Sequence, residues 1–210
     1  MKKFLGVFCS ILFLSFSAVA APADLQKIEN YLNSLQTIKA NFVQMASNGG
    51  TAEGKIYIAK PSKIRMEYTS PDEMLIVGNG DYIIYNDKEL DQVTNIDYKD
   101  IPATMILTQK IKFDGQNLKV IDFYKDGGQT SVTVEMPKNK SVKPITLIFD
   151  NSPFRLKQWK VVDPQNIEIT ISFFDIDRMV NVSRGILYSL YFQLQYILLP
   201  STRNVRPLDK

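Results

Sequence analysis

Residues 54–92 read GKIYIAKPSKIRMEYTSPDEMLIVGNGDYIIYNDKELDQ, and this stretch decides the fold class. It contains four short apolar runs, at Lys55–Ala59, Lys63–Tyr68, Met74–Val77 and Tyr82–Tyr85. Turn-forming residues separate these runs: Lys60-Pro61-Ser62, Ser70-Pro71-Asp72 and Gly78-Asn79-Gly80-Asp81. Because proline fixes φ for a turn and Asn-Gly supplies the positive φ of tight hairpins, the stretch predicts an antiparallel meander.

The second run shows which kind of sheet the meander forms. Ile64, Met66 and Tyr68 alternate with charged residues at every second position. Successive side chains of a strand point to opposite faces, so this run predicts a sheet with one apolar and one solvated face.

The same stretch resembles the periplasmic outer-membrane lipoprotein carrier family, LolA. The pattern is a glycine before the first strand, a basic-proline turn, R-x-x-Y, P-D-E, N-G and a closing D-Q. The matching residues are Gly54, Lys60-Pro61, Arg65, Tyr68, Pro71-Asp72-Glu73, Asn79-Gly80, Tyr85 and Asp91-Gln92. Looser matches extend the resemblance over roughly residues 25–175.

This resemblance implies an incomplete antiparallel β-barrel, that is a strongly curved sheet, with a small α-helical lid over an apolar cavity. It also implies a chaperone that binds the acyl chains of lipidated proteins. Its partners would be an inner-membrane ABC transporter, which delivers the cargo, and an outer-membrane lipoprotein acceptor, which receives it. The implied protein hydrolyses nothing and needs no cofactor.

We expect the cavity wall to come from the alternating apolar residues of the meander: Ile56, Ile58, Ile64, Met66, Tyr68, Met74 and Ile76. Periodicity alone equally predicts that these residues form a dry core, and only the resemblance favours a cavity. Lys60 occupies a position where family members often carry an arginine that holds the lid shut by hydrogen bonds. Lysine has three donors but no planar fork, so a looser lid is expected.

Residues 1–20 have the pattern of a secretory signal peptide. Lys2-Lys3 precede a short apolar run, and the segment ends in Ala18-Val19-Ala20. We expect cleavage after Ala20 and a periplasmic location. Cleavage would remove Cys9 and lower the formal net charge from +3 to +1, because the two lysines are the charged residues of the segment. That balance offers no argument for nucleic-acid binding.

The rest of the chain is also predicted to be mainly β. Apolar spacing predicts a helix over Asp24–Leu35 with Asp24 as N-cap, and a first strand over Thr37–Met45. Thr94–Asp100 is polar and predicts a loop, and a short helix is expected from Pro102 to Lys110. Further strands, in an up-and-down order, are expected at Leu118–Tyr124, Thr130–Met136, Pro144–Phe149, Leu156–Val162 and Ile167–Phe174.

The expected domain organisation has three parts: the signal peptide 1–20, a carrier domain 21–182 and an atypical C-terminal segment 183–210. Gly185–Pro200 alternates as a strand does, although several of its apolar residues also share a helix face. The segment is either a diverged closing strand or sequence foreign to the fold, and the pattern leaves both open.

The sequence offers no catalytic residues and no metal ligands that we would single out. It contains no histidine, no Gly-x-Ser-x-Gly and no phosphate-binding loop, and Asp72-Glu73 would point to opposite faces of a strand. We therefore expect a monomeric binding protein, not an enzyme. Two alternatives stay open: another lipid- or glycolipid-binding module of the same fold, and a structural β-sandwich that binds no lipid.

Overall fold

The computed structural model describes residues 22–178. The predicted signal peptide, 1–20, and the whole atypical C-terminal segment, 183–210, lie outside the described residues. The described part of the chain begins with an α-helix, α1 (Pro22–Ser34), and two short 3₁₀ helices follow later, η1 (Tyr98–Asp100) and η2 (Pro102–Leu107). The other elements within residues 22–178 are strands.

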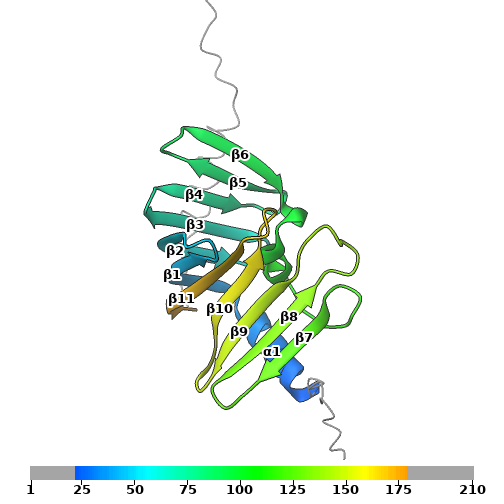
Figure 1. Ribbon diagram of the computed structural model, residues 1–210. Coiled ribbons are helices and arrows are strands. Elements are labelled where there is room, and N and C mark those ends of the chain that lie inside the picture. Colours follow the sequence, from blue (N-terminus) through cyan, green and yellow to red (C-terminus); the bar gives the residue numbers. More distant parts are fainter. Residues whose placement is uncertain (1–21, 179–210) are drawn as a thin grey trace, which may run out of the picture.

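Eleven strands form one antiparallel sheet that does not close (Figure 1). Their bounds are β1 Thr37–Ala46, β2 Thr51–Ala59, β3 Lys63–Ser70, β4 Met74–Gly78, β5 Tyr82–Asp87, β6 Gln92–Asp97, β7 Lys119–Lys125, β8 Gln129–Glu135, β9 Ile145–Asn151, β10 Phe154–Val162 and β11 Glu168–Asp177. The order across the sheet is β6-β5-β4-β3-β2-β1-β11-β10-β9-β8-β7. The fold class expected from the sequence, an open and strongly curved antiparallel sheet with a small helical cover, is confirmed.

β1 joins the two halves of the sheet, because it pairs with β2 on one side and β11 on the other. Phe42 lies opposite Gly54 in β2 and opposite Phe173 in β11. Gly54 is required there: a Cβ atom at this position would lie 2.0 Å from the carbonyl oxygen of Glu67. This close approach of β2 and β3 also brings the ring of Tyr68 edge-on against Phe42, with 5.0 Å between centroids.

The core lies on the concave face of the sheet. The inner side chains of β1 to β5 and of β8 to β11 form one apolar cluster with the apolar stripe of α1 and with η2. Ile28, Tyr31 and Leu32 are buried residues of α1, and Leu35, directly after the helix, is buried with them. The opposite face of β4 and β5 carries a separate small cluster of Leu75, Val77 and Ile84. One layer of helix therefore covers one face of the sheet.

Three local predictions were wrong or inexact. Thr94–Asp100 was expected to be a loop, but Gln92–Asp97 is strand β6, paired with β5. β6 is an edge strand and largely exposed, so it lacks the apolar alternation that signals a strand. Asp24 is not the N-cap, since α1 begins at Pro22 and Asp24 lies in its first turn. The helix expected from Pro102 starts there, but it is a 3₁₀ helix and ends at Leu107.

Candidate functional site

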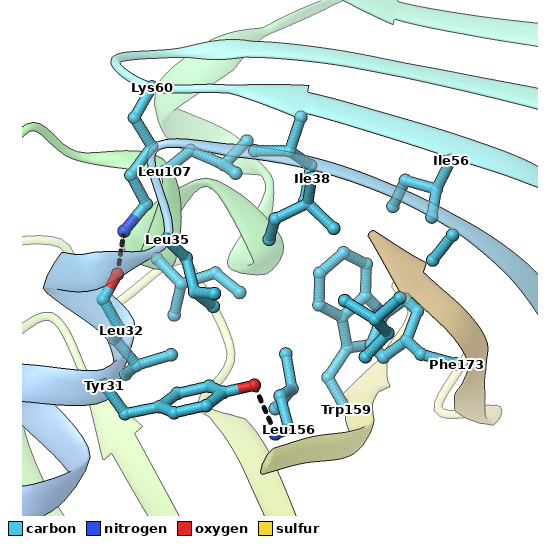
Figure 2. A pocket seen from close by; sticks show the side chains of 14 residues that line it. Tyr31, Leu32, Leu35, Ile38, Ile56, Lys60, Leu107, Leu156, Trp159 and Phe173 are labelled. Atoms are coloured by element: carbon cyan, nitrogen blue, oxygen red, sulfur yellow. Dashed lines mark hydrogen bonds between the residues drawn. The ribbon is translucent and has the colours of Figure 1, made fainter. Parts of the chain in front are cut away.

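The concave face contains two adjoining hollows, and the first lies beneath α1. We call it the helix-covered hollow (Figure 2). The space left in it for water-sized spheres is about 20 Å³, close to the minimum that holds one water molecule. Its walls are Tyr31, Leu32, Leu35, Ile38, Ala40, Ile56, Ile58, Lys60, Ile106, Leu107, Leu156, Trp159, Phe173 and Ile176.

The second hollow lies over the β3–β5 meander, and we call it the meander hollow. It offers about 220 Å³ to water-sized spheres and shares Leu107 and Trp159 with the helix-covered hollow. Its other walls are Gln44, Ile64, Met66, Tyr68, Met74, Ile76, Ile83, Tyr85, Ile101, Ala103, Thr104, Val161, Ile169 and Ile171. The Tyr68 hydroxyl donates to Oε1 of Gln44 at 2.9 Å. Burial raises the pKa values of Tyr68 and Tyr85, so both phenols stay neutral at physiological pH.

The structure divides the predicted site residues between these two hollows. Ile56, Ile58 and Lys60 line the helix-covered hollow. The other five, Ile64, Met66, Tyr68, Met74 and Ile76, line the meander hollow. Leu107 of η2 and Trp159 of β10 separate the two groups.

Lys60 connects the β2–β3 turn to α1. Its Nζ donates a hydrogen bond to the carbonyl oxygen of Leu32 at 2.8 Å, as Figure 2 shows. Leu32 lies in the last turn of α1, where carbonyl groups lack helical partners and carry the negative end of the helix dipole. The β2–β3 turn is also bound to η2, because Ser62 N donates to Leu107 O at 2.8 Å. Lys60 thus sits where both helices meet the turn.

Lys60 is the charged residue among the described residues that line the helix-covered hollow. Burial lowers the pKa of its ammonium group from 10.5 to about 8, because apolar surroundings disfavour the charged form. A hydrogen bond to a carbonyl oxygen compensates part of this cost but adds no opposite charge. The contact is consequently sensitive to protonation and to movement of α1.

A second polar contact also fastens the C-terminal part of α1. The Tyr31 hydroxyl accepts hydrogen bonds from Leu156 N at 2.9 Å and from Nη2 of Arg178 at 2.7 Å. The Tyr31 ring packs edge-on against Phe149 and Phe154, and the Arg178 guanidinium lies 4.5 Å from its centroid. Figure 2 shows the hydroxyl reaching β10 across the floor of the hollow.

The outer side of α1 is joined to the loop after η2. Asn33 accepts from Ile111 N at 2.7 Å and donates to Ile111 O at 2.9 Å. Glu29 accepts from Phe113 N at 2.5 Å. These contacts pair side chains of the helix with the backbone of a loop about 80 positions away in sequence. Helix and loop therefore form one packed unit over the concave face.

Sequence reasoning did not identify the walls that α1, η2, β10 and β11 contribute. Trp159, Val161, Ile169 and Ile171 lie on the inner face and line the meander hollow. The alternation of these residues was visible, and it predicts that each pair shares a face. Nothing in a local pattern indicates that this face turns toward the first meander, because that depends on the β1–β11 pairing.

The two hollows are suited to apolar ligands. Among residues 22–178 no group of three or more metal-ligating side chains gathers in one place. Within the same residues, no helix has the length and apolar character needed to cross a bilayer. Of the polar side chains at the hollows, Lys60, Tyr31 and Tyr68 are bonded to other protein groups. What the geometry offers a ligand is apolar surface, part of it covered by α1.

Comparison with known proteins gives a consistent result. The family model described as outer membrane lipoprotein carrier protein LolA matches residues 33–186. An uncharacterized protein of Rickettsia prowazekii is 25% identical over 187 residues, covering 87% of this chain and 85% of that protein. An outer-membrane lipoprotein carrier protein of Pseudomonas aeruginosa is 28% identical over 181 residues, covering 78% of this chain and 83% of the relative.

A solved structure shares the fold. It is that of a putative outer membrane lipoprotein-sorting protein domain from Vibrio parahaemolyticus. The TM-score is 0.51 at 10% sequence identity, over 81% of this chain and 97% of that one. At 10% sequence identity, this comparison supports similarity of the fold alone.

Proposed function

The chain belongs to the LolA family of outer-membrane lipoprotein carriers, and on that premise we propose that it is a periplasmic chaperone for lipidated proteins. It binds the acyl chains of its cargo on the concave face of the sheet and makes or breaks no covalent bond. The observation that carries this proposal is the pair of adjoining apolar hollows, one sealed by α1 and the other partly open.

Apolar burial alone is strong enough for this task. Each methylene removed from water contributes about 0.8 kcal/mol, so a few acyl chains outweigh the free energy of any single polar contact. Release then depends on a better apolar site elsewhere, and not on hydrolysis by this chain. The seven apolar residues predicted from the sequence act as walls in this proposal, Ile56 and Ile58 under α1 and the other five over the meander.

The described conformation is the closed, cargo-free one in this proposal. About 20 Å³ beneath α1 has no room for an acyl chain, so cargo must displace the helix. Displacement would break the Lys60–Leu32 and Tyr31–Leu156 hydrogen bonds while leaving every strand pairing intact. Lys60 thereby acts as the lid lock, and it stabilises the closed form alone, as a conformational switch requires.

The remaining assignments are part of the same proposal. Residues 1–20 direct the chain across the inner membrane, and residues 21–182 form the carrier domain. An inner-membrane ABC transporter supplies the cargo, and an outer-membrane acceptor removes it. The direction of transfer comes from ATP used by the transporter and from the relative affinities of carrier and acceptor.

Native mass spectrometry of protein purified from the periplasm tests the proposal. A complex whose added mass equals that of a triacylated lipoprotein is expected, and Ile64→Glu should reduce its abundance. Bound phospholipid or glycolipid without protein would favour the other lipid-binding modules of this fold. A chain that never carries added mass, even after incubation with inner-membrane vesicles loaded with labelled lipoprotein, would contradict the carrier function.

A further inference from the structure

A third hollow lies outside the concave face, between the loop after η2 and the β8–β9 connection. It offers about 340 Å³ to water-sized spheres. Its lining residues are Met105, Thr108, Lys110, Lys112, Asn117, Leu118, Met136, Lys138 and Asn139, and we call it the lysine hollow. Both connections lie on the same side of the sheet in Figure 1. The carrier function uses none of these side chains except Met105, which belongs to η2.

The rim of the lysine hollow is positively charged, and its floor is apolar. Lys110, Lys112 and Lys138 are exposed, and none of the nine described lining residues is acidic. Within residues 22–178 these three lysines form no ion pair. Asp114 is close along the chain: its carboxylate accepts the backbone N–H groups of Gln116 and Asn117 at 2.9 Å and interacts electrostatically with Lys112 without forming an ion pair.

The floor consists of Met105, Leu118 and Met136, of which the first two are buried. A shallow apolar floor inside a ring of lysines suits a ligand with phosphate oxygens at one end and carbon chains next to them. Lysine binds phosphate as a compact point charge and does not require the bidentate geometry of arginine.

We propose that the lysine hollow docks the protein on the anionic phospholipid headgroups of a bilayer surface. A protein partner fits the composition less well. Protein interfaces are enriched in arginine, methionine and aromatic residues and depleted in lysine, and the described lining has three lysines and two methionines but neither arginine nor an aromatic residue. Juxtaposed lysines over an apolar floor are instead the pattern of attraction to anionic membranes.

The lysine hollow adjoins α1 and η2, the two helices that cover the concave face. Lys110 and Lys112 flank Ile111, whose backbone is bonded to Asn33 of α1 through both its N–H and its carbonyl group. η2 contributes Met105 to the lysine hollow and Leu107 to both hollows of the concave face. A bilayer bound at the lysine hollow therefore contacts the unit that covers the acyl-binding face. Docking itself does not depend on what cargo the protein carries.

Flotation with lipid vesicles tests the docking surface without any cargo. The wild-type protein should float with vesicles containing one third phosphatidylglycerol at low ionic strength, and not with pure phosphatidylcholine vesicles. Each lysine near an anionic surface strengthens binding about fivefold, so Lys110→Gln/Lys112→Gln/Lys138→Gln should weaken it about 100-fold. Raising the salt concentration should weaken wild-type binding, because the attraction is screened within about a Debye length.

A matched control carries the same charge change on the opposite face of the sheet. Lys39, Lys55 and Lys63 are exposed residues of β1, β2 and β3, and Lys39→Gln/Lys55→Gln/Lys63→Gln should bind almost as the wild type does. Equal losses in the two triple variants would overturn the proposal, as would wild-type protein that ignores anionic vesicles. Wild-type binding to an immobilised polyglutamate peptide but not to the vesicles would assign the hollow to an acidic protein and overturn the lipid assignment. None of these outcomes bears on lipoprotein transfer, so the carrier function stands or falls separately.

Discussion

The helix-covered hollow and the meander hollow lie on one face of one sheet, yet they differ about tenfold in free volume. The first leaves about 20 Å³ and the second about 220 Å³. Their strands follow the same apolar alternation, with Ile56 and Ile58 in β2 and Ile64 and Met66 in β3. The difference comes from α1, which places Tyr31 and Leu32 in the first hollow alone, followed there by Leu35 just after the helix. The space available to a ligand is therefore set by the position of one helix.

The polar contacts of the two hollows differ in the same way. Under α1, Lys60 and Tyr31 bond the helix to the turn and to β10. Over the meander, Tyr68 bonds to Gln44, which joins β3 to β1 within the sheet. Breaking the Lys60 and Tyr31 hydrogen bonds would release α1 from the sheet, whereas breaking the Tyr68–Gln44 bond would loosen the pairing of strands that line the meander hollow. The comparison predicts that substitutions in the two hollows have different effects, and the largest is expected for a buried charge.

Ile56→Glu should have the largest effect. Ile56 is 0% exposed beneath α1, so the new carboxyl group must be held neutral. Burial of this kind raises a glutamate pKa by roughly 3 to 5 units, and keeping a carboxyl group of ordinary pKa about 4.3 neutral at pH 7 costs about 3.5 kcal/mol in the free energy of unfolding. Urea unfolding followed by far-UV circular dichroism measures the loss.

Ile64→Glu is the matched substitution in the meander hollow, where about 220 Å³ lets water reach the carboxylate. It should cost about half as much, and the folded variant should bind lipoprotein more weakly. If both variants lose the same stability, the two hollows are equally dry core and the comparison fails.

Lys60→Leu should shift the position of α1. It removes a hydrogen bond from a charged donor, a contribution of roughly 1.5–3 kcal/mol that exists only in the closed form. A shift of that size changes the ratio of closed to open protein by about 10- to 100-fold. The variant should retain labelled lipoprotein when it is mixed with the outer-membrane acceptor, and amide hydrogen exchange in α1 should accelerate.

Lys60→Arg is the control, because it keeps the cation and adds donors. It should transfer lipoprotein as the wild type does or close more tightly. Normal transfer and normal exchange in Lys60→Leu would leave Lys60 an ordinary lysine of the β2–β3 turn.

Tyr31→Phe removes the acceptor of a buried backbone group. Leu156 N donates to the Tyr31 hydroxyl at 2.9 Å, and its loss should cost about 1–3 kcal/mol in the free energy of unfolding. Tyr68→Phe should cost about 1 kcal/mol, since the half-buried Gln44 can turn to water. Urea unfolding of both variants measures these losses in free energy of unfolding. Hydrogen exchange at the Leu156 amide reports whether its bond to Tyr31 is lost. A larger loss for Tyr68→Phe would reverse the assignment of the fastening contacts.

The strands that line the site were predictable because their inner face is apolar at every second residue. Ile64, Met66 and Tyr68 show this pattern, and all three are buried on the concave face. β6 escaped prediction because an edge strand exposed to solvent needs no apolar face. It forms because the Asp87 carboxylate accepts the N–H groups of Glu89 and Leu90 and turns the chain back along β5.

The cover of the site was predictable only in part. Spacing indicated that α1 is amphipathic, and the resemblance suggested that it lies over a cavity and that Lys60 bonds to it. The other fastening contacts join distant positions: Tyr31 reaches Leu156 across 125 positions, and Asn33 reaches Ile111 across 78. No local pattern specifies such partners, because they follow from the packing of the whole sheet around β1.

The smallest expected effect concerns pH and the protonation of Lys60. Burial lowers its pKa to about 8 in the folded chain, against about 10.5 when the chain is unfolded. Between these values the unfolded state binds more protons, so this group makes the free energy of unfolding rise with pH. The slope is at most about 1.4 kcal/mol per pH unit, since a single proton is involved. Below pH 8 both states are charged, and the burial penalty is present in full.

The slope can be isolated by comparing the wild type with Lys60→Met from pH 7.5 to 9.5. Tyr31, the other titratable residue lining the helix-covered hollow, is common to both proteins. Tyr68, Tyr85 and Tyr98, whose pKa values burial raises, would lower stability only near pH 10 and above, and they cancel in the difference. The wild type should gain stability relative to Lys60→Met as the pH rises. Lys60 is buried in the closed form, so loss of its proton favours that form, and hydrogen exchange in α1, compared with Lys60→Met at the same pH, should slow as the pH rises. Parallel pH profiles for the two proteins would show that Lys60 is hydrated and ordinary, and that the cover is held by Tyr31 and the apolar contacts of α1.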